Sequence, residues 1–155
     1  MMLRDFEVQM LATTRLLCEA DRELIANVLK SLFAHRKAGD LDGMMNLVAA
    51  DIVCFPGTSW GYARYPRPIV GKDAVREAFW QRHIKYVTLE STVHRLLIDG
   101  DSAAVHRTTK IRERGGGDAL TFDAIDFFRF RDGLIVEFCE LPDGTAYDAV
   151  INFPH

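Results

Sequence analysis

The sequence lacks the features of a membrane, secreted or metal-dependent protein. Its longest apolar runs are too short to cross a bilayer, and acidic residues interrupt the apolar stretch that a signal peptide would need near the N-terminus. Cysteine is scarce: Cys18, Cys54 and Cys139 are odd in number and far apart, which is typical of reduced thiols. None of them pairs with a nearby Cys or His at metal-ligand spacing. We therefore expect a cytoplasmic protein with no metal and no membrane partner.

An excess of charge of one sign is nearly absent as well, because 19 lysines and arginines stand against 22 aspartates and glutamates. The net charge of −3 gives no general attraction to nucleic acid. The segment TSWGYARYPRP mixes aromatic residues with Arg64 and Arg67, a pattern that could bind nucleic acid, but two bases in an acidic chain favour a protein without such a partner. The run Gly115-Gly116-Gly117 is not followed by the Lys-Ser/Thr of a phosphate-binding loop, so it predicts a turn.

What remains is the composition of an ordinary globular domain, 48% hydrophobic and 26% charged. A chain of 155 residues can bury a sizeable core, and we expect one domain over residues 1–155, with a helical extension over residues 1–20 and the core over residues 20–150. The loop from Pro56 to Gly71, rich in proline and aromatic residues, is interpreted as a lid or rim, or as an ordered surface loop.

Hydrophobic periodicity predicts helices first and strands later. Helical spacing predicts one helix before residue 20, a second from an Asp21 cap to Gly39, a third over residues 40–50 and a fourth over residues 72–83. A short strand is expected at residues 51–55, and from Tyr86 onward the pattern alternates with a period of two. The predicted class is α+β: a curved antiparallel sheet packed on N-terminal helices.

Two acidic residues break the apolar face of the last two strands. In the segment Thr121–Glu140, alternation places Asp126 among phenylalanines, and the Arg131-Asp132-Gly133 turn brings Glu140 onto a similar face. A carboxylate on such a face must find a partner, change its pKa or line a cavity. We expect Asp126 to face an internal hollow.

The preceding strand supplies a histidine. Alternation groups Ala104, His106, Thr108 and Lys110 on one side, and we assign His106 to the side of Asp126, where its titration near neutral pH would suit proton transfer. The other side of the last strands carries Ile125 and Phe127, which are too apolar for open water. We expect a homodimer through that outer face of the sheet.

The segments GDLDGMMNLVAADIV, GKDAVREAF and AIDFFRFRDGLIVEF, in this order of elements, resemble the nuclear-transport-factor-2-like superfamily, which includes ketosteroid isomerases, polyketide cyclases, epoxide hydrolases of the limonene type and scytalone dehydratases. The resemblance covers roughly residues 20–150. It implies a cone-shaped domain with an internal pocket between the sheet and the helices, usually as a dimer.

The resemblance carries over only some catalytic positions. Asp126 stands where the isomerases keep an acid that an apolar site can hold neutral. Their base falls at Phe55-Pro56 and their tyrosine near Leu32, so steroid isomerisation is disfavoured. Glu140 stands where the epoxide hydrolases place one acid of an acid–arginine–acid relay. The matching strand is expected to offer His106 and Thr108 instead of arginine and aspartate, so that relay is expected to be broken.

We hypothesise a cofactor-free enzyme that isomerises, cyclises or dehydrates a small, largely apolar carbonyl or hydroxyl compound. The expected catalytic residues are His106, Asp126 and Glu140, and no cofactor is expected. The expected pocket lining is Phe55, Trp60, Tyr62, Tyr86, Thr108, Phe122, Phe128 and Phe138. Two alternatives stay open: a protein of the same fold that binds a ligand without chemistry, and a dimeric accessory module whose pocket is filled by its own side chains.

Overall fold

A computed structural model of the chain describes the backbone of residues 2–55 and 68–143, and the side chains of residue 19 and of residues 21–55 and 68–143. Within these residues the elements are, in chain order, α1 (Met2–Ala38), α2 (Leu41–Met45), β1 (Val48–Phe55), β2 (Ile69–Val70), α3 (Lys72–Lys85), β3 (Tyr86–Asp99), β4 (Ser102–Glu113), β5 (Leu120–Arg131) and β6 (Leu134–Pro142). The expected pocket residues Trp60 and Tyr62, most of the expected lid, and the C-terminal tail lie outside the described residues.

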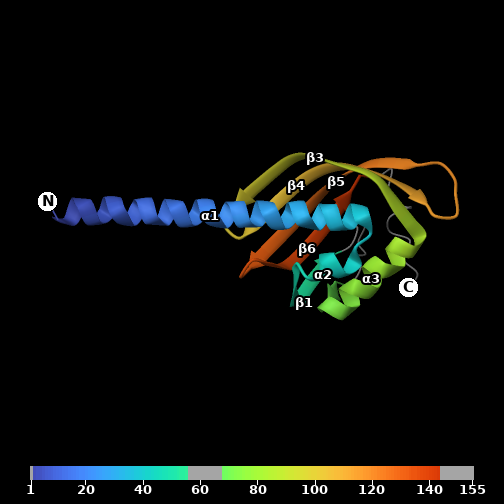
Figure 1. The fold of residues 1–155 in the computed structure, drawn as a ribbon, viewed down its shortest axis with the longest axis horizontal. Helices are drawn as coiled ribbons and strands as arrows, with labels where there is room; N and C mark the ends of the chain where they lie inside the picture. Colours follow the sequence, from blue (N-terminus) through green and yellow to red (C-terminus); the bar gives the residue numbers. More distant parts are fainter. Residues whose placement is uncertain (1, 56–67, 144–155) are drawn as a thin grey trace.

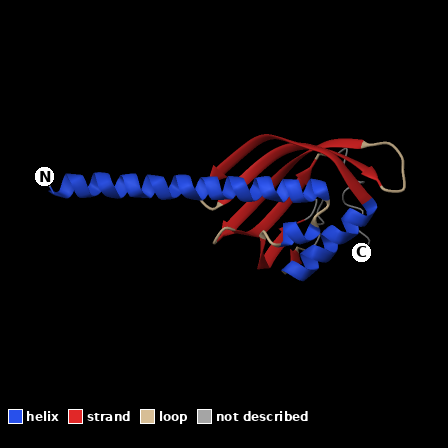
Figure 2. Ribbon diagram, viewed as in Figure 1, coloured by secondary structure: helices blue, strands red, loops and turns tan. Residues whose placement is uncertain are grey.

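The strands form one six-stranded, curved and unclosed sheet in the order β2-β1-β6-β5-β4-β3. β1 runs parallel to β6, and every other neighbouring pair is antiparallel. The three helices lie against one face of this sheet (Figure 2). The α+β class expected from the sequence is confirmed.

α1 is a single helix of 37 residues, where the sequence predicts two. No glycine or proline stands between Met2 and Ala38, so nothing interrupts the backbone hydrogen bonds, and Asp21 lies inside the helix instead of capping a second one. Its C-terminal half lies across the sheet, and its N-terminal half extends beyond it (Figure 1). Ile25, Leu29 and Leu32 are buried.

The chain turns sharply after α1 and enters the sheet earlier than expected. Gly39 has φ +70°, and Asp40 then caps α2 by accepting a hydrogen bond from the backbone N–H of Gly43 at 2.9 Å. α2 ends at Met45 and not near residue 50, because Val48 already pairs with Ile135 on β6. The core lies between α1, α2, α3 and the sheet. Its most deeply buried apolar residues are Leu29, Ile52, Val75, Val105 and Ile135.

The pairing of β4 with β5 decides which side chains share a face. Val105 lies directly opposite Asp126, and His106 lies opposite Ile125. Paired residues on neighbouring strands point to the same side, so the odd-numbered residues of β4 accompany Asp126 into the interior. The expectation that His106 shares the face of Asp126 is therefore wrong, and Arg107 takes that place. Alternation separates the two faces of a single strand, but it does not report the register between neighbouring strands.

Gly39 offers a test of the packing between the α1–α2 turn and α3. A Cβ at Gly39 would lie 2.3 Å from Cε1 of His83, whereas a Cβ at Gly100, which also has positive φ (+57°), meets nothing within 4 Å. Gly100→Ala should therefore cost only the backbone strain of a left-handed conformation, about 1 kcal/mol, and Gly39→Ala should cost more. Urea unfolding of both variants measures the difference. Equal losses would show that His83 does not pack on Gly39.

Candidate functional site

Three charged side chains from adjacent strands meet on the buried face of the sheet. Arg107 is on β4, Asp126 on β5 and Glu140 on β6, and their side chains are 1%, 0% and 1% exposed. Arg107 donates through Nε to Oδ2 of Asp126 at 2.6 Å and through Nη2 to Oδ1 of the same carboxylate at 3.3 Å. Its Nη2 also donates to Oε1 of Glu140 at 2.7 Å. One guanidinium thus binds two carboxylates that face each other across β5 and β6.

Glu140 has two further partners, which come from the helices. Arg36, in the last turn of α1, donates through Nη2 to Oε1 at 3.0 Å. Arg82 on α3 donates to Oε2 at 2.6 Å and to Oε1 at 3.3 Å. Glu140 therefore accepts hydrogen bonds from three guanidinium groups and connects both long helices to the sheet. We call Arg36, Arg82, Arg107, Asp126 and Glu140 the buried network.

The two carboxylates of the buried network differ in proton affinity. Burial opposes the charge of Glu140, but the guanidinium groups of Arg82, Arg36 and Arg107 outweigh it and hold its pKa well below the ordinary value. Burial raises the pKa of Asp126 more than its ion pair with Arg107 lowers it. Asp126 has one guanidinium, which it shares with Glu140. Of the two acids, Asp126 is therefore the first to take up a proton as the pH falls.

The pKa values of two of the guanidinium groups are shifted in opposite directions. Burial and the neighbouring guanidinium charges lower the pKa of Arg36 to about 10, although Glu140 counteracts them. Burial also disfavours the charge of Arg107, but the carboxylates of Asp126 and Glu140 overcome it and raise the pKa of Arg107. Arg107 is thus fully compensated by its partners, and Arg36 is not.

A cleft of about 50 Å³ adjoins the buried network on the side of the helices. Arg107 donates through Nη1 to Oγ1 of Thr109, which lies on the cleft wall, so the hydroxyl hydrogen of Thr109 is available to a ligand. His83 also lines the cleft and contacts Arg114 through Nε2 at 3.3 Å. The lining residues are Arg36, Gly39, Leu41, Met44, Phe79, Arg82, His83, Tyr86, Thr88, Thr109 and Ile111.

The structure brings together only part of the expected site. Asp126 and Glu140 share the inner face, as predicted, but both are bound to guanidinium groups and neither lines the cleft. Tyr86 does line it. Phe128 and Phe138 stack on each other in the core, with ring centroids 5.0 Å apart.

Phe122 belongs to a separate small cluster with Ile111 and Ala124. It is buried but does not line the cleft. Its place in the expected pocket is therefore not supported by the geometry.

His106 and Thr108 lie on the outer face of the sheet, opposite to the expected side. Nε2 of His106 is 3.3 Å from Oδ2 of Asp123, and Thr108 donates to Oδ1 of the same carboxylate at 2.5 Å. Nε2 of His94 is 2.6 Å from the hydroxyl of Thr108. These residues form an exposed polar cluster that has no path to Asp126 through the sheet.

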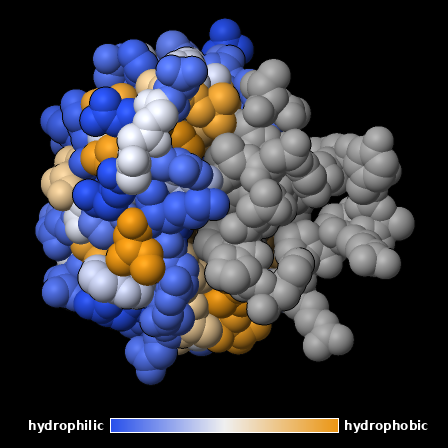
Figure 3. Space-filling model, turned by 90° about the vertical axis from the view of Figure 1, so that its right-hand side faces the viewer, coloured by the Kyte–Doolittle hydropathy of each residue, from blue (hydrophilic) through white to orange (hydrophobic). Residues whose placement is uncertain are grey.

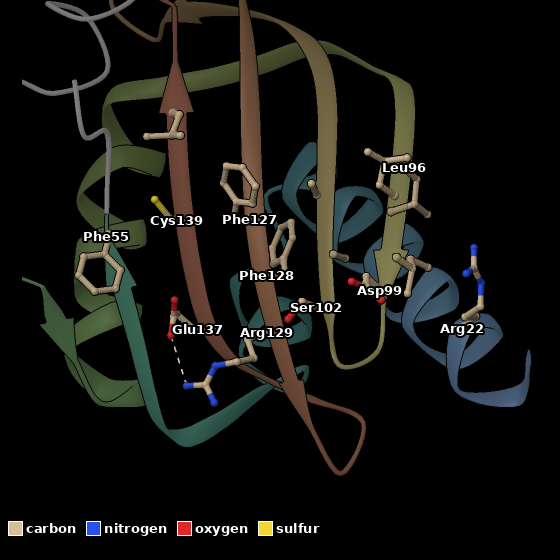
Figure 4. A pocket seen from close by; sticks show the side chains of 15 residues that line it. Arg22, Phe55, Leu96, Asp99, Ser102, Phe127, Phe128, Arg129, Glu137 and Cys139 are labelled. Atoms are coloured by element: carbon tan, nitrogen blue, oxygen red, sulfur yellow. Dashed lines mark hydrogen bonds and ion pairs between the residues drawn. The ribbon is translucent and has the colours of Figure 1, made fainter. Parts of the chain in front are cut away.

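An open hollow of about 900 Å³ is lined mainly by the outer face of the sheet, and its lining also includes Arg22 on α1 and the inner-face residue Phe128. Figure 4 shows Phe55, Phe127 and Cys139 among its lining, with Arg129 and Glu137 joined by an ion pair at 3.3 Å. Phe55 therefore faces this hollow and not the inner cleft. By contrast, the described residues at the end of the molecule shown in Figure 3 are mostly hydrophilic, with scattered hydrophobic ones.

The arginines are what the sequence reading missed. Arg107 interrupts the set Val105, Thr109 and Ile111 in the same way that Asp126 interrupts its phenylalanines, and this matching anomaly was a readable signal. It also restores an acid–arginine–acid group, which the sequence predicts to be broken. Arg36 and Arg82 gave no comparable signal, because a basic residue near the end of a helix is usually solvated.

The described part of the chain has neither a metal-binding cluster nor a membrane-spanning helix. Among the described side chains, those of residues 19, 21–55 and 68–143, no three from His, Cys, Asp or Glu come together in a way that could hold a metal ion. No helix in the same part of the chain has both the length and the apolar character needed to cross a bilayer.

The profile of the SnoaL-like domain matches residues 29–138, more than two thirds of the chain. No curated protein matches the sequence.

Several solved structures share the fold. A candidate isomerase from Bacillus subtilis superposes with a TM-score of 0.72 at 15% identity, over 84% of this chain and 94% of the other. An NTF2-like protein from Burkholderia xenovorans LB400 has a TM-score of 0.63 at 17% identity, over 84% and 97%. An LEH-like epoxide hydrolase from M. tuberculosis has a TM-score of 0.65 at 16% identity, over 83% and 90%. At these identities the similarity shows the fold alone, and it confirms the nuclear-transport-factor-2-like resemblance.

The lowered pKa of Glu140 gives a pH-dependent prediction. A carboxyl whose pKa is lower in the folded than in the unfolded state stabilises the fold above its unfolded pKa, about 4.3, and this stability is lost as the pH falls further towards the folded value. Glu140→Gln should lose about 3–5 kcal/mol at pH 7, because it breaks a buried pair, and should show a flatter decline in stability below about pH 4.3. Urea unfolding between about pH 3 and pH 7 measures both effects, because this range includes the ordinary pKa of a glutamate carboxyl.

Glu137→Gln is the matched control on the same strand. Glu137 lies on the outer face and pairs with Arg129 in solvent, so its replacement should change the stability and its pH profile little. Indistinguishable profiles for the two variants would contradict the assigned role of Glu140.

Proposed function

We propose that this chain, which belongs to the SnoaL-like domain family, binds a small, largely apolar molecule by its carbonyl or hydroxyl group and catalyses a cofactor-independent isomerisation, cyclisation or dehydration. The observation that carries the proposal is the position of the cleft. Its wall contains guanidinium groups of a buried network from which water is largely excluded. Hydrogen-bond donors in such surroundings stabilise developing negative charge far better than they do in water.

Arg82 and Arg36 are the proposed oxyanion donors. When a proton leaves the carbon next to a carbonyl, the negative charge collects on the oxygen, and these two guanidinium groups lie on the cleft wall to receive it. Glu140 and Asp126 act as positioning residues, because they hold the arginines and do not contact the cleft. A single donor of this kind lowers the barrier by about 2.7–4 kcal/mol in known enzymes.

His83 is the proposed proton carrier. It is the one histidine among the described residues of the cleft wall, and it takes the place that the sequence suggested for His106. The proton that His83 removes can return to another carbon in an isomerisation or protonate a departing hydroxyl in a dehydration. In a cyclisation, the carbanion left behind attacks a second carbonyl of the same molecule. General acid–base catalysis typically contributes about 10²–10⁴-fold.

The cleft is small compared with typical ligand pockets of about 300–1,000 Å³. At about 50 Å³ it accommodates the reacting polar group, while the apolar remainder of the ligand extends out of it. Phe79, Met44 and Ile111 on the cleft wall are suited to contact the carbon atoms next to that group.

A hydrolase of the epoxide type is the second candidate. The arrangement of Arg107 between Asp126 and Glu140 favours it, since an acid–arginine–acid group is what the resemblance to epoxide hydrolases implies. Such a reaction needs a carboxylate that reaches a water molecule beside the substrate. Neither carboxylate lines the cleft here, so the oxyanion role remains the better supported one.

Binding without chemistry is the third candidate, because no carboxylate is available in the cleft as a base.

We also propose a cytoplasmic location, as the sequence predicts. Burial raises the pKa of the Cys54 thiol to about 12, so this cysteine is an inert part of the core.

Hydrogen exchange at carbon tests the enzymatic proposal. Small cyclic and aromatic ketones are incubated with the protein in D₂O, and the loss of their α-proton signals is followed by NMR. His83→Gln should slow the exchange catalysed by the protein by about 100-fold or more, whereas His106→Gln, on the outer face, should leave it unchanged. A loss confined to His106→Gln would remove the chemistry from the cleft. Thermal stabilisation by a ketone without any exchange would favour the binding protein instead.

We propose further that two copies of the chain associate through the outer face of the sheet. Three large apolar side chains on this face are solvent-exposed: Leu97 (61%), Ile125 (43%) and Phe127 (47%). Such a concentration of apolar surface is typical of an interface.

Light scattering during size exclusion tests the dimer. The wild-type protein should have twice the mass of one chain, and Phe127→Arg should have the mass of one chain, because it places a charge in the centre of the contact. Ile84→Arg on α3 is the control: Ile84 is also 47% exposed but lies away from the sheet's outer face, so this variant should stay dimeric. A wild-type protein of single-chain mass would overturn the proposal.

A further inference from the structure

The buried network contains more positive than negative charge. Three guanidinium groups, from Arg36, Arg82 and Arg107, face two carboxylates, from Asp126 and Glu140. With both acids ionised the network has an excess of one positive charge. Protonation of Asp126, whose pKa burial raises, increases this excess. A buried charge without a counter-charge is costly, so one additional anion would balance the charge of the network.

The excess lies on the side of the cleft. Every guanidinium nitrogen of Arg107 donates a hydrogen bond: Nε and Nη2 to Asp126, Nη1 to Thr109, and Nη2 also to Glu140. Arg36 gives Glu140 only its Nη2. The side chains of Arg36 and Arg82 retain 15% and 13% of their exposure, and both line the cleft. The guanidinium groups with remaining donor capacity are thus the ones that a ligand can reach.

No acidic residue offsets this charge within the cleft. Its described wall contains two arginines, a histidine, a tyrosine and two threonines, but no aspartate or glutamate. Arg114, which lies behind His83 and donates to its backbone carbonyl at 2.8 Å, adds a further positive charge nearby. The lowered pKa of Arg36 agrees with a guanidinium that its present partners compensate only in part.

We infer that the cleft recognises a carboxylate group of its ligand, which Arg36 and Arg82 bind as a counter-ion. This inference rests on the proposed function, which places the ligand in the same cleft. The planar guanidinium fork matches the two oxygens of a carboxylate. Thr88 and Thr109, which both line the cleft, supply hydroxyl groups for the remaining lone pairs. A volume of about 50 Å³ is enough for a polar group of a few heavy atoms, such as a carboxylate.

The inference narrows the substrate class to small, largely apolar acids. The carboxylate need not be the reacting group: bound by the arginines, it orients an adjacent carbonyl or hydroxyl toward His83. A ligand of this class is negatively charged, and so is the protein as a whole, at −3. General electrostatic attraction therefore cannot bring the two together, and binding has to depend on the local positive charge of the cleft.

Benzoate and benzamide form a matched pair of probes for this inference. They have nearly the same size and shape, but only benzoate is charged. Binding is measured by isothermal titration and by thermal unfolding, with the ionic strength kept constant by sodium chloride. Benzoate should bind about 10- to 100-fold more tightly than benzamide, because hydrogen bonds to a charged partner are stronger than those to a neutral one.

Arg82→Gln is the variant that should remove this preference. It leaves two guanidinium groups for two carboxylates, so the buried network stays charge-balanced and Glu140 keeps Arg36 and Arg107 as partners, at the cost of some stability. Arg76→Gln removes the same charge from the same helix. Because Arg76 pairs with Asp42 at the surface, it should leave the preference for benzoate intact. Arg82→Lys should keep part of the preference, because it keeps the charge without the fork.

Each outcome decides the question. A benzoate preference that Arg82→Gln abolishes and Arg76→Gln preserves supports the inference. Equal affinity for the two probes overturns it and leaves the proposed function standing, since a neutral molecule then occupies the cleft. A benzoate preference unchanged in Arg82→Gln places the anion elsewhere and also overturns it. If neither probe binds, the inference fails, and the hydrogen-exchange experiment decides the proposed function separately.

Discussion

One guanidinium held between two carboxylates, out of contact with water, is the interaction on which the rest of this structure depends. Arg107 connects Asp126 and Glu140 and thereby joins three adjacent strands on the inner face of the sheet. Glu140 extends the connection to α1 and α3 through Arg36 and Arg82. Such an ion cluster contributes little net stability compared with an apolar core, but it is very sensitive to the loss of a single member. It therefore fixes how the helices sit on the sheet.

The same cluster explains why the proposed ligand-binding groups lie at its edge and not at its centre. Asp126 is the most buried charged group among the described residues, and Arg107 donates to both of its oxygens. The surplus positive charge belongs to Arg36 and Arg82, which are partly accessible from the cleft. A preorganised guanidinium beside a small opening can serve a bound anion or an oxyanion that develops during a reaction, because both need the same donors.

The sequence predicted local structure well where one element contains the whole signal. The Arg131-Asp132-Gly133 turn has the positive φ that its glycine suggests, and it places Glu140 directly opposite Asp126. The prediction for His106, which depended on the relative position of two elements, was wrong. His106 was assigned to the inner face although alternation along β4 is equally consistent with either side. Shifting a strand by one residue against its neighbour exchanges all its faces, and no pattern within a single strand reports that shift.

What the amino-acid sequence determined by itself is the order of helices before strands, the α+β class and the anomaly of two acids on an apolar face, because periodicity and burial cost act locally. What only the tertiary structure decided is which basic groups answer those acids. Arg36 is 104 residues from Glu140 and Arg82 is 58 residues from it. Such partners meet only after the helices have packed and the strand register is set. Their encounter is a property of the folded chain, since nothing in the local sequence around either arginine specifies a carboxylate so far away.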